Sequence, residues 1–600
     1  MGREGLTKKA RIPEAVADIQ VNFCKNPTCL NFGRPASTNP QPRGPGAKER
    51  GRDPYVISTR HQGSVVFLRC QCCGETPPLK SNLGIYEEIQ RITAYLFDEK
   101  LEPCCPETGC PNYGTGISIH GAYYSFGKTR SGSQRYRCRQ CSKTFSVGPS
   151  TLRQKRPEIN EMTFKLLVNK MPFKRICETV GISMKTLYGK IDFIHQQCLD
   201  FAAEQERTFP ELDIHRLYIS VDRQDHRINW SQANDKRNII LSALGSADNV
   251  SGFVFGVHVN YDSRLSQHEV EQDAKHCGDE DVKPPFRRYA RLWLEKDYDR
   301  SLARNIVRRT WRKKNDLTES ILEQYDHTSS REDVESPDLI KGTTSLPRQG
   351  LMVHSEYTLY AHFFFLQQML RNVGKVRFYL DQESGIRAAC LAAFQQEVLE
   401  KRCDAFFVRV NKALTINEKR RLKAQSTRDF EGLRESDPAY DLLSDFDLRL
   451  IVIQQRMKNL VDIGPWHDRW LVSPFPDMSE PEKAICWLTD LKDRIYGKEQ
   501  LARLYARATL HGIDRFFMQV RRRLSLLERP IASASSEGRK WHGYSAYNPA
   551  MVGKLLDIFR VFYNYVAVGE DKKTPAMRIR IARAPISIHE IIQAKPTAKQ

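Results

Sequence analysis

The chain has 600 residues, too many for one hydrophobic core, so we expect three or four folded units. Hydrophobic residues make up 40% and charged residues 28%, which is ordinary for a globular protein, and no stretch reaches the roughly 18 apolar residues that span a bilayer. The formal net charge of +21 favours a polyanionic partner, although charge alone does not separate DNA from RNA or an anionic membrane.

The start of the chain and its cysteines bear on the compartment. The first residues contain no apolar signal segment, so we expect a cytoplasmic protein. Ten of the sixteen cysteines precede residue 142, and most of them come in close pairs. In a long chain without a secretion signal, paired cysteines indicate metal binding before they indicate disulfides.

One cysteine pattern occurs twice in the N-terminal quarter. Each copy begins with Cys-x4-Cys followed by x-Asn-aromatic-Gly, and ends with Arg-Cys-x-x-Cys-x-x-Thr. Four thiolates in two close pairs suit a tetrahedral structural Zn²⁺ site, so we predict two zinc ribbons, over 1–80 and 100–150. Reduced, buried cysteines without metal are the alternative. The eight predicted Zn²⁺ ligands are Cys24, Cys29, Cys70, Cys73, Cys105, Cys110, Cys138 and Cys141.

The second copy is also rich in basic residues with interleaved tyrosine and phenylalanine. Arg135 and Arg137 lie in the strand-forming run before its last cysteine pair. That composition suits contacts with DNA phosphates together with some stacking on bases, and a solvated basic face is the alternative.

Residues 155–205 have the helical spacing of a helix-turn-helix DNA-binding domain. Pro172 ends a first helix, Gly181 ends a second, and Ser183 is placed to cap a third. In that geometry the side chains that face DNA are Ser183, Lys185, Thr186 and Lys190. A three-helix packing unit without DNA contacts is the alternative.

Residues 212–568 have the pattern of an α/β domain. Strands are predicted over 217–221, 238–243, 252–259, 376–380 and 404–410, and the first and fourth end at Asp222 and Asp381. Carboxylates at the ends of neighbouring strands can hold two Mg²⁺ or Mn²⁺ ions about 4 Å apart, as phosphoryl transfer on DNA requires. A third carboxylate should come from a helix packed on the sheet.

The order of these units resembles the DDE transposases of bacterial insertion elements that have an InsA-type zinc-binding half. The likeness is sharp over 104–145, 217–245, 376–390 and 509–530. It implies a ribonuclease H-like catalytic domain with insertions at about 265–350 and 412–500, which have no counterpart in the family. It also implies cleavage and strand transfer at element ends and target DNA by a homo-oligomer associated with the bacterial nucleoid.

The same resemblance suggests the third carboxylate. The segment from Thr509 to Leu524 is similar to the helix that carries it in the family, which makes Asp514 the first candidate. The family residue is usually glutamate, so Glu383, Glu480, Glu482 and Glu528 stay open as alternatives. On this helix Arg521, Arg522 and Arg523 are candidates for DNA phosphate contacts, or a solvated flank.

Two other functions fit the same sequence. One is a transposase-derived DNA-binding regulator without catalysis, and the other is a nuclease of the same fold. The basic segment 569–600 is expected to be a loosely held tail.

Overall fold

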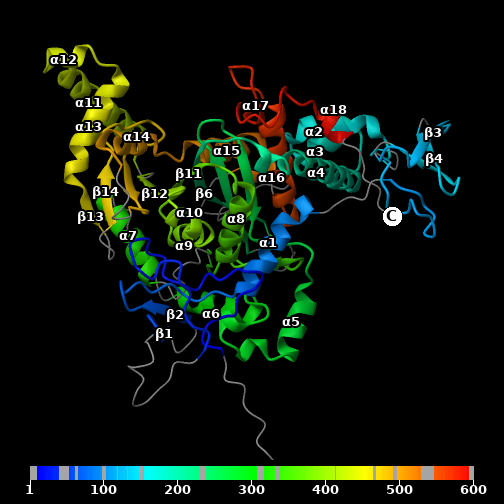
Figure 1. Ribbon diagram of the computed structural model, residues 1–600, viewed down its shortest axis with the longest axis horizontal. Coiled ribbons are helices and arrows are strands. Elements are labelled where there is room, and N and C mark those ends of the chain that lie inside the picture. The colour runs from blue at the N-terminus through cyan, green and yellow to red at the C-terminus, as the bar shows by residue number, and fades with distance from the viewer. Residues whose placement is uncertain are drawn as a thin grey trace, which may run out of the picture.

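A computed structural model shows a multidomain protein of mixed α/β class built around one large mixed sheet (Figure 1). It describes residues 10–39, 53–60, 65–97, 103–117, 119–130, 133–148, 150–151, 154–229, 235, 237–306, 317–330, 338, 340–411, 414–463, 468–490, 496–528 and 546–593. Over these ranges no helix has both the length and the apolar character needed to cross a bilayer.

The central sheet has eight strands in the order β13-β14-β15-β12-β11-β6-β7-β8. Strands β6, β7 and β8 form an antiparallel meander, and β11 and β12 run parallel to β6. The remaining three strands continue the sheet in antiparallel fashion beyond β12. The strands are β6 (Arg216–Ile228), β7 (Ile239–Asp248), β8 (Val254–Val259), β11 (Lys375–Asp381), β12 (Cys403–Val410), β13 (Val461–Ile463), β14 (Asp468–Val472) and β15 (Lys483–Trp487).

All five predicted strands are present, because each contains a β-branched or aromatic run. The first does not end at Asp222, as predicted, but continues to Ile228, because residues 222–228 extend the antiparallel ladder with β7. The second predicted insertion does not fold as a separate unit. Its strands β13 to β15 join the main sheet. Trp470 on β14 is fully buried and stacks on Phe407 of β12, with ring centroids 6.2 Å apart. The insertion is therefore fastened to the sheet by aromatic packing.

Helices cover both faces of the sheet. Helices α8 (Ser355–Met369) and α9 (Ser384–Ala393) pack on one face, and α1 (Asn82–Phe97) packs against α8. Helix α15 (His511–Arg523) lies on the other face against β6 and β7, while α16 (Ala550–Val561) packs on β8. The first face has alternate residues Leu217, Ile219 and Val221 of β6 in the main core.

The other helices belong to the insertions and to the C-terminal part. The first insertion contains α5 (Gln267–His276), α6 (Glu295–Ile306) and α7 (Leu317–Ser330), and α10 (Gln395–Leu399) follows α9. The second insertion contains α11 (Ile416–Glu435), α12 (Pro438–Asp441) and α13 (Asp445–Arg456), and α14 (Lys498–Arg507) follows it. In Figure 1 helices α11 to α13 extend away from the central sheet.

The N-terminal part contains the small units that the sequence predicts. The first cysteine unit has the hairpin β1 (Tyr55–Arg60) and β2 (Val65–Cys70), and the second has the sheet β3 (Tyr123–Lys128), β4 (Gln134–Cys138) and β5 (Thr144–Val147). In the chain, the helices α2 (Asn160–Leu167), α3 (Phe173–Val180) and α4 (Met184–Glu206) come between the second unit and the first strand of the large sheet.

The C-terminal segment corrects one expectation. Up to Gln593 the chain is packed rather than loose, with the short helices α17 (Pro575–Arg578) and α18 (Ile588–Ile592). Ile591 is fully buried, and α18 contacts α2 and α4. The apolar run Ile588, Ile591 and Ile592 explains this, since its one-turn spacing gives the basic segment an apolar face. Residues 594–600 lie outside the described ranges.

Candidate metal centres and active site

Both predicted cysteine sets converge into compact clusters. The four Sγ atoms of Cys24, Cys29, Cys70 and Cys73 lie within 4.8 Å of one another, and so do those of Cys105, Cys110, Cys138 and Cys141. Paired Sγ atoms are 3.4 and 3.7 Å apart in the first cluster and 3.3 and 3.6 Å apart in the second. A tetrahedral zinc ion with Zn–S bonds of about 2.3 Å needs sulfur atoms about 3.8 Å apart. Both clusters therefore fit Zn²⁺.

The two clusters share hydrogen bonds at corresponding positions. Asn31 Nδ2 donates to Cys70 Sγ at 3.3 Å, and Asn112 Nδ2 donates to Cys138 Sγ at the same distance. The hydroxyls of Tyr55 and Tyr123 each accept the backbone N–H of the first cysteine, at 3.1 and 2.9 Å. Hydrogen bonds to sulfur orient metal-binding thiolates.

Sequence reasoning missed the two tyrosines. Each pairs in the hairpin with the third cysteine of its set, Tyr55 with Cys70 and Tyr123 with Cys138. The signal was available, because aligning the two copies on their third cysteines places a tyrosine 15 residues upstream in both.

Each cluster also contains a thiol whose pKa is shifted toward the metal-binding form. A hydrogen bond from Cys24 lowers the pKa of Cys73 to about 5. Burial opposes ionisation of Cys138, but the backbone N–H groups of Cys141 and Gln140 outweigh it and lower the pKa of Cys138 to about 6. Burial raises the pKa of Cys29, Cys105 and Cys110, and the hydrogen bond with Cys73 raises that of Cys24, so in each cluster one thiol ionises readily while these neighbours stay protonated until a metal ion binds.

The two ribbons differ in how they meet the rest of the molecule. In the first, Glu75 forms an ion pair with Arg387 of α9 at 2.8 Å, and Lys80 pairs with Glu356 of α8 at 2.6 Å. The Lys80–Glu356 pair and the Glu75 side chain are largely buried. In Figure 1 the strands β3 and β4 of the second ribbon lie at the edge of the molecule, away from the central sheet. The first ribbon is thus joined to the body by ion pairs, and the second lies at the periphery.

The helix-turn-helix candidate has the predicted turn. Gly181 takes a left-handed conformation with φ of 66°, and the Ser183 hydroxyl accepts the backbone N–H of Thr186, capping α4. Ser183, Lys185 and Thr186 are exposed at the start of α4.

Lys190 corrects the expectation for this helix. It is only 2% exposed, and its ammonium group donates to the backbone carbonyls of Lys155 and Arg156, at 2.5 and 3.1 Å. The residues before α2 fold back over this side of α4, so the charge is used within the protein and does not face a DNA groove.

Asp222 and Asp381 lie next to each other in the sheet. Strands β6 and β11 are parallel and paired as far as Val221 and Leu380, and the two aspartates are the next residues on each strand. Both point to the same face, because the Tyr218 and Tyr379 rings stack on that face at 6.4 Å and side chains alternate along a strand. Asp222 is buried and Asp381 is partly buried.

Helix α15 covers this face. Its first turn is fixed by two side chains of the sheet, since Ser220 Oγ accepts the N–H of Ile513 and Asn249 Oδ1 accepts that of Gly512, both at 3.0 Å. Ser220 is two residues before Asp222 on the same face of β6. Asp514, half-buried in the first turn of α15, therefore lies on the same side of the sheet as Asp222 and Asp381.

The three carboxylates do not form a single compact cluster. Among the residues that the structure describes, only the two cysteine sets bring three or more potential ligand atoms within 4.8 Å of one another. A pair of metal ions about 4 Å apart can be held by oxygen atoms spread over about 8 Å, since each Mg–O bond is about 2.1 Å. The absence of a carboxylate cluster within 4.8 Å among the described residues therefore counts against a single shared ion and leaves a two-ion site open.

The alternative glutamates have other roles in the fold. Glu480 accepts the N–H of Leu510 at 3.0 Å and pairs with Lys483 at 2.7 Å, which holds the start of α15. Glu383 pairs with Arg223 at 3.3 Å, and Glu528 pairs with Lys170 at 3.0 Å. The fourth alternative, Glu482, accepts a hydrogen bond from Asn411 at 2.8 Å.

Two of the three arginines of α15 form hydrogen bonds within the protein, and one is exposed to solvent. Arg521 donates to Gln224 of β6, and Arg523 donates to Asn169 at 3.3 Å, joining α15 to the loop after α2. Arg522 is exposed. In the second ribbon Arg135 and Arg137 are partly exposed on β4.

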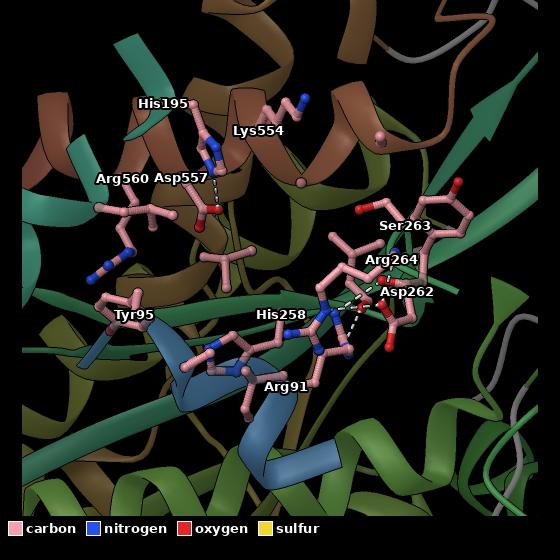
Figure 2. A pocket seen from close by; sticks show the side chains of 18 residues that line it. Arg91, Tyr95, His195, His258, Asp262, Ser263, Arg264, Lys554, Asp557 and Arg560 are labelled. Carbon is pink, nitrogen blue, oxygen red and sulfur yellow. Dashed lines mark hydrogen bonds and ion pairs between the residues drawn. The ribbon is translucent and has the colours of Figure 1, made fainter. Parts of the chain in front are cut away.

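A separate cavity of about 280 Å³ lies along the β8 edge of the sheet, between α1, α4 and α16. Figure 2 shows His195 and Asp557 facing each other above it, with Arg91 and His258 below. His195 Nε2 is 2.9 Å from Asp557 Oδ2, and Arg91 donates to the carbonyls of Tyr261 and Val259. None of Asp222, Asp381 and Asp514 lines this cavity, and its charged groups are engaged in the fold.

Comparison of the chain with protein-family models gives no match, and comparison with curated proteins gives none at a significant level.

Proposed function

We propose that this protein is a DNA transposase of the DDE type, with a ribonuclease H-like catalytic domain and a DNA-binding N-terminal half. The observation that carries the proposal is that Asp222, inside β6, and Asp381, at the end of β11, directly follow the last paired residues of these two parallel strands. An antiparallel meander of three strands followed by two strands parallel to the first supports a ribonuclease H-like domain.

The residues suggest how such a site would work. Asp222 and Asp381 would hold Mg²⁺ or Mn²⁺, with Asp514 supplying a third carboxylate from α15. Bound ions of this kind activate an attacking hydroxyl and stabilise the leaving oxygen of a phosphodiester. The buried Asp222 and helix α15, which packs on β6 and β7, would orient the DNA strand and limit access of bulk water.

The N-terminal half would bring the DNA to this site. Ser183, Lys185 and Thr186 at the start of α4 are exposed in the position from which a recognition helix reads the major groove. Arg135, Arg137 and Arg522 add positive charge on exposed or partly exposed surfaces, in keeping with the net charge of +21. Two DNA ends must be handled together, so we propose that the protein acts as a homo-oligomer.

The test is a cleavage and joining assay with the full-length, zinc-loaded protein and Mg²⁺. The substrate is duplex DNA taken from the sequence that flanks its own gene. We expect the wild-type protein to nick this DNA and join the freed 3′ end to a second duplex. Asp222→Asn should bind the DNA but neither cut nor join it. Asp225→Asn is the matched control, because Asp225 is on the same strand but the opposite face, bonded to Ser242 at 2.7 Å.

The two alternatives give different results in the same assay. A catalytically inactive DNA-binding regulator would bind without cleavage by either protein. A nuclease would cleave without joining. Each of these outcomes would overturn the transposase proposal.

A further inference from the structure

The two ribbons can be compared position by position, because their hairpins pair in the same register. Tyr55 faces Cys70 in the first, and Tyr123 faces Cys138 in the second. One residue further along, Val56 faces Arg69 in the first ribbon, whereas Tyr124 faces Arg137 in the second. An aliphatic side chain in one copy thus corresponds to an aromatic ring in the other.

The outer face of the second ribbon carries two exposed aromatic rings. Tyr124 and Phe126 alternate on β3, on the face opposite the zinc cluster, and are 38% and 40% exposed. Their rings meet edge to face with centroids 6.3 Å apart. Exposed neighbouring aromatic rings on a small domain indicate a binding surface.

Arginines surround these rings. The guanidinium groups of Arg135 and Arg137 are 5.2 and 5.6 Å from the centre of the Phe126 ring, and that of Arg139 is 5.8 Å from the centre of the Tyr124 ring. The cations are therefore held beside the rings by cation–π contact, within reach of a phosphate group on anything that lies across the face.

The first ribbon lacks this combination. The position of Lys143 in the second ribbon corresponds to Glu75 in the first, since both carbonyls accept the N–H of the third cysteine, at 2.9 Å, and Lys143 pairs with Glu107 of its own ribbon. Glu75 is used in the ion pair with Arg387 of the body. The positive, aromatic face is specific to the copy that lies at the edge of the molecule (Figure 1).

We infer that the face formed by Tyr124, Phe126, Arg135, Arg137 and Arg139 binds unpaired bases of a DNA strand. This inference rests on the proposed function for the choice of DNA. Aromatic side chains bind nucleic acid by stacking on base faces, and arginines bind the phosphates between them. In a duplex the base faces are covered by their neighbours, so rings on a flat sheet find partners only where bases are unstacked, as at an opened or cleaved end.

The test compares two DNA ligands with the full-length protein loaded with zinc. One is a blunt duplex, and the other is the same duplex with a 3′ oligothymidine overhang, both measured by fluorescence anisotropy at one salt concentration. The wild-type protein should bind the overhang duplex more tightly. The double variant Tyr124→Ala/Phe126→Ala should lose on the order of 10- to 100-fold in affinity for the overhang duplex, and little for the blunt one.

Two controls make the result specific. Val56→Ala changes the matching position of the first ribbon and should leave both affinities unchanged. Tyr124→Phe keeps the ring and should bind as the wild type, and a zinc content equal to that of the wild type shows that the double variant keeps its ribbon.

The outcomes separate this inference from the proposed function. One outcome is that the wild-type protein binds both duplexes while the double variant keeps its affinity for both, or loses affinity for both equally. In that case the inference is wrong and the proposed function stands. If the wild-type protein binds no DNA at all, both are wrong.

Discussion

Replacing Gly512 with alanine tests how the first turn of α15 is held on the sheet next to Asp222. Gly512 is in the first turn of α15, two residues before Asp514. A Cβ atom there would lie 2.5 Å from Asn249 Oδ1 and 2.9 Å from Ser220 Oγ. These are the two oxygens that accept the first N–H groups of the helix, so the methyl group would displace the contacts that fix the position of Asp514.

The size of the effect follows from opposing contributions. Alanine in place of glycine favours a helix by about 1 kcal/mol. Two hydrogen bonds are worth about 1 kcal/mol each, and overpacking a tight contact costs about 1–3 kcal/mol. The net expectation is a loss of about 2–4 kcal/mol in the free energy of unfolding. The same displacement should reduce DNA cleavage at protein concentrations where the variant is fully folded.

Gly553→Ala is the matched control, because Gly553 is inside α16 and a Cβ atom there would have no atom within 4 Å. It should stabilise the protein by up to about 1 kcal/mol. Urea denaturation of both variants measures the change in the free energy of unfolding, which should be negative for Gly512→Ala and positive for Gly553→Ala. If Gly512→Ala is as stable as Gly553→Ala, α15 is not held on Ser220 and Asn249, and the placement of Asp514 beside the site is wrong.

Three further predictions concern metal, DNA and pH. Purified protein should contain about two Zn²⁺ per chain, and Cys73→Ser should reduce this to about one by elemental analysis, whereas a wild-type content of one or none would contradict the duplicated sites. Lys185→Ala should weaken DNA binding at all sequences and reduce the slope of log affinity against log salt by about 1, and an unchanged slope would exclude a phosphate contact. Burial lowers the pKa of His362 to about 3 and that of the adjacent His258 well below its usual value, so below about pH 6.5 the unfolded state binds more protons than the folded state. The free energy of unfolding should therefore fall with falling pH, by up to about 1.4 kcal/mol per pH unit for each histidine. In urea denaturation between pH 7 and 5, His362→Asn should show a weaker pH dependence than the wild type. An identical dependence in the variant would show that the two histidines are not its source.

The two four-cysteine clusters could be predicted from the sequence because their cysteines come in local pairs. The spacing within each pair fixes a knuckle, and the repetition of the pattern shows which pairs belong together. The strands that contain Asp222 and Asp381 could also be predicted, since a β-branched run followed by a carboxylate is a local signal. The predicted end of the first strand at Asp222 is wrong, because β6 continues to Ile228 in its ladder with β7. The parallel pairing of these two strands joins residues far apart in the chain. No local pattern in the sequence predicts it.

Other features were missed for the same physical reason. Trp470 of the second insertion stacks on Phe407 of the main sheet. This contact joins residues far apart in the chain. Lys190 was placed on the DNA-facing side of its helix because helical periodicity tells which residues share a face but not which neighbour covers it. The residues before α2 cover that face, and the carbonyls of Lys155 and Arg156 bind the ammonium group.

The central claim is that Asp222 and Asp381 hold divalent ions together, and Mn²⁺ binding tests it most directly. Titration of the zinc-loaded protein, followed by electron paramagnetic resonance of free Mn²⁺, should show about two bound ions in the wild type and in Asp225→Asn. Asp222→Asn and Asp381→Asn should each lose at least one of them. Equal Mn²⁺ binding by all four proteins, or none by the wild type, would contradict the claim.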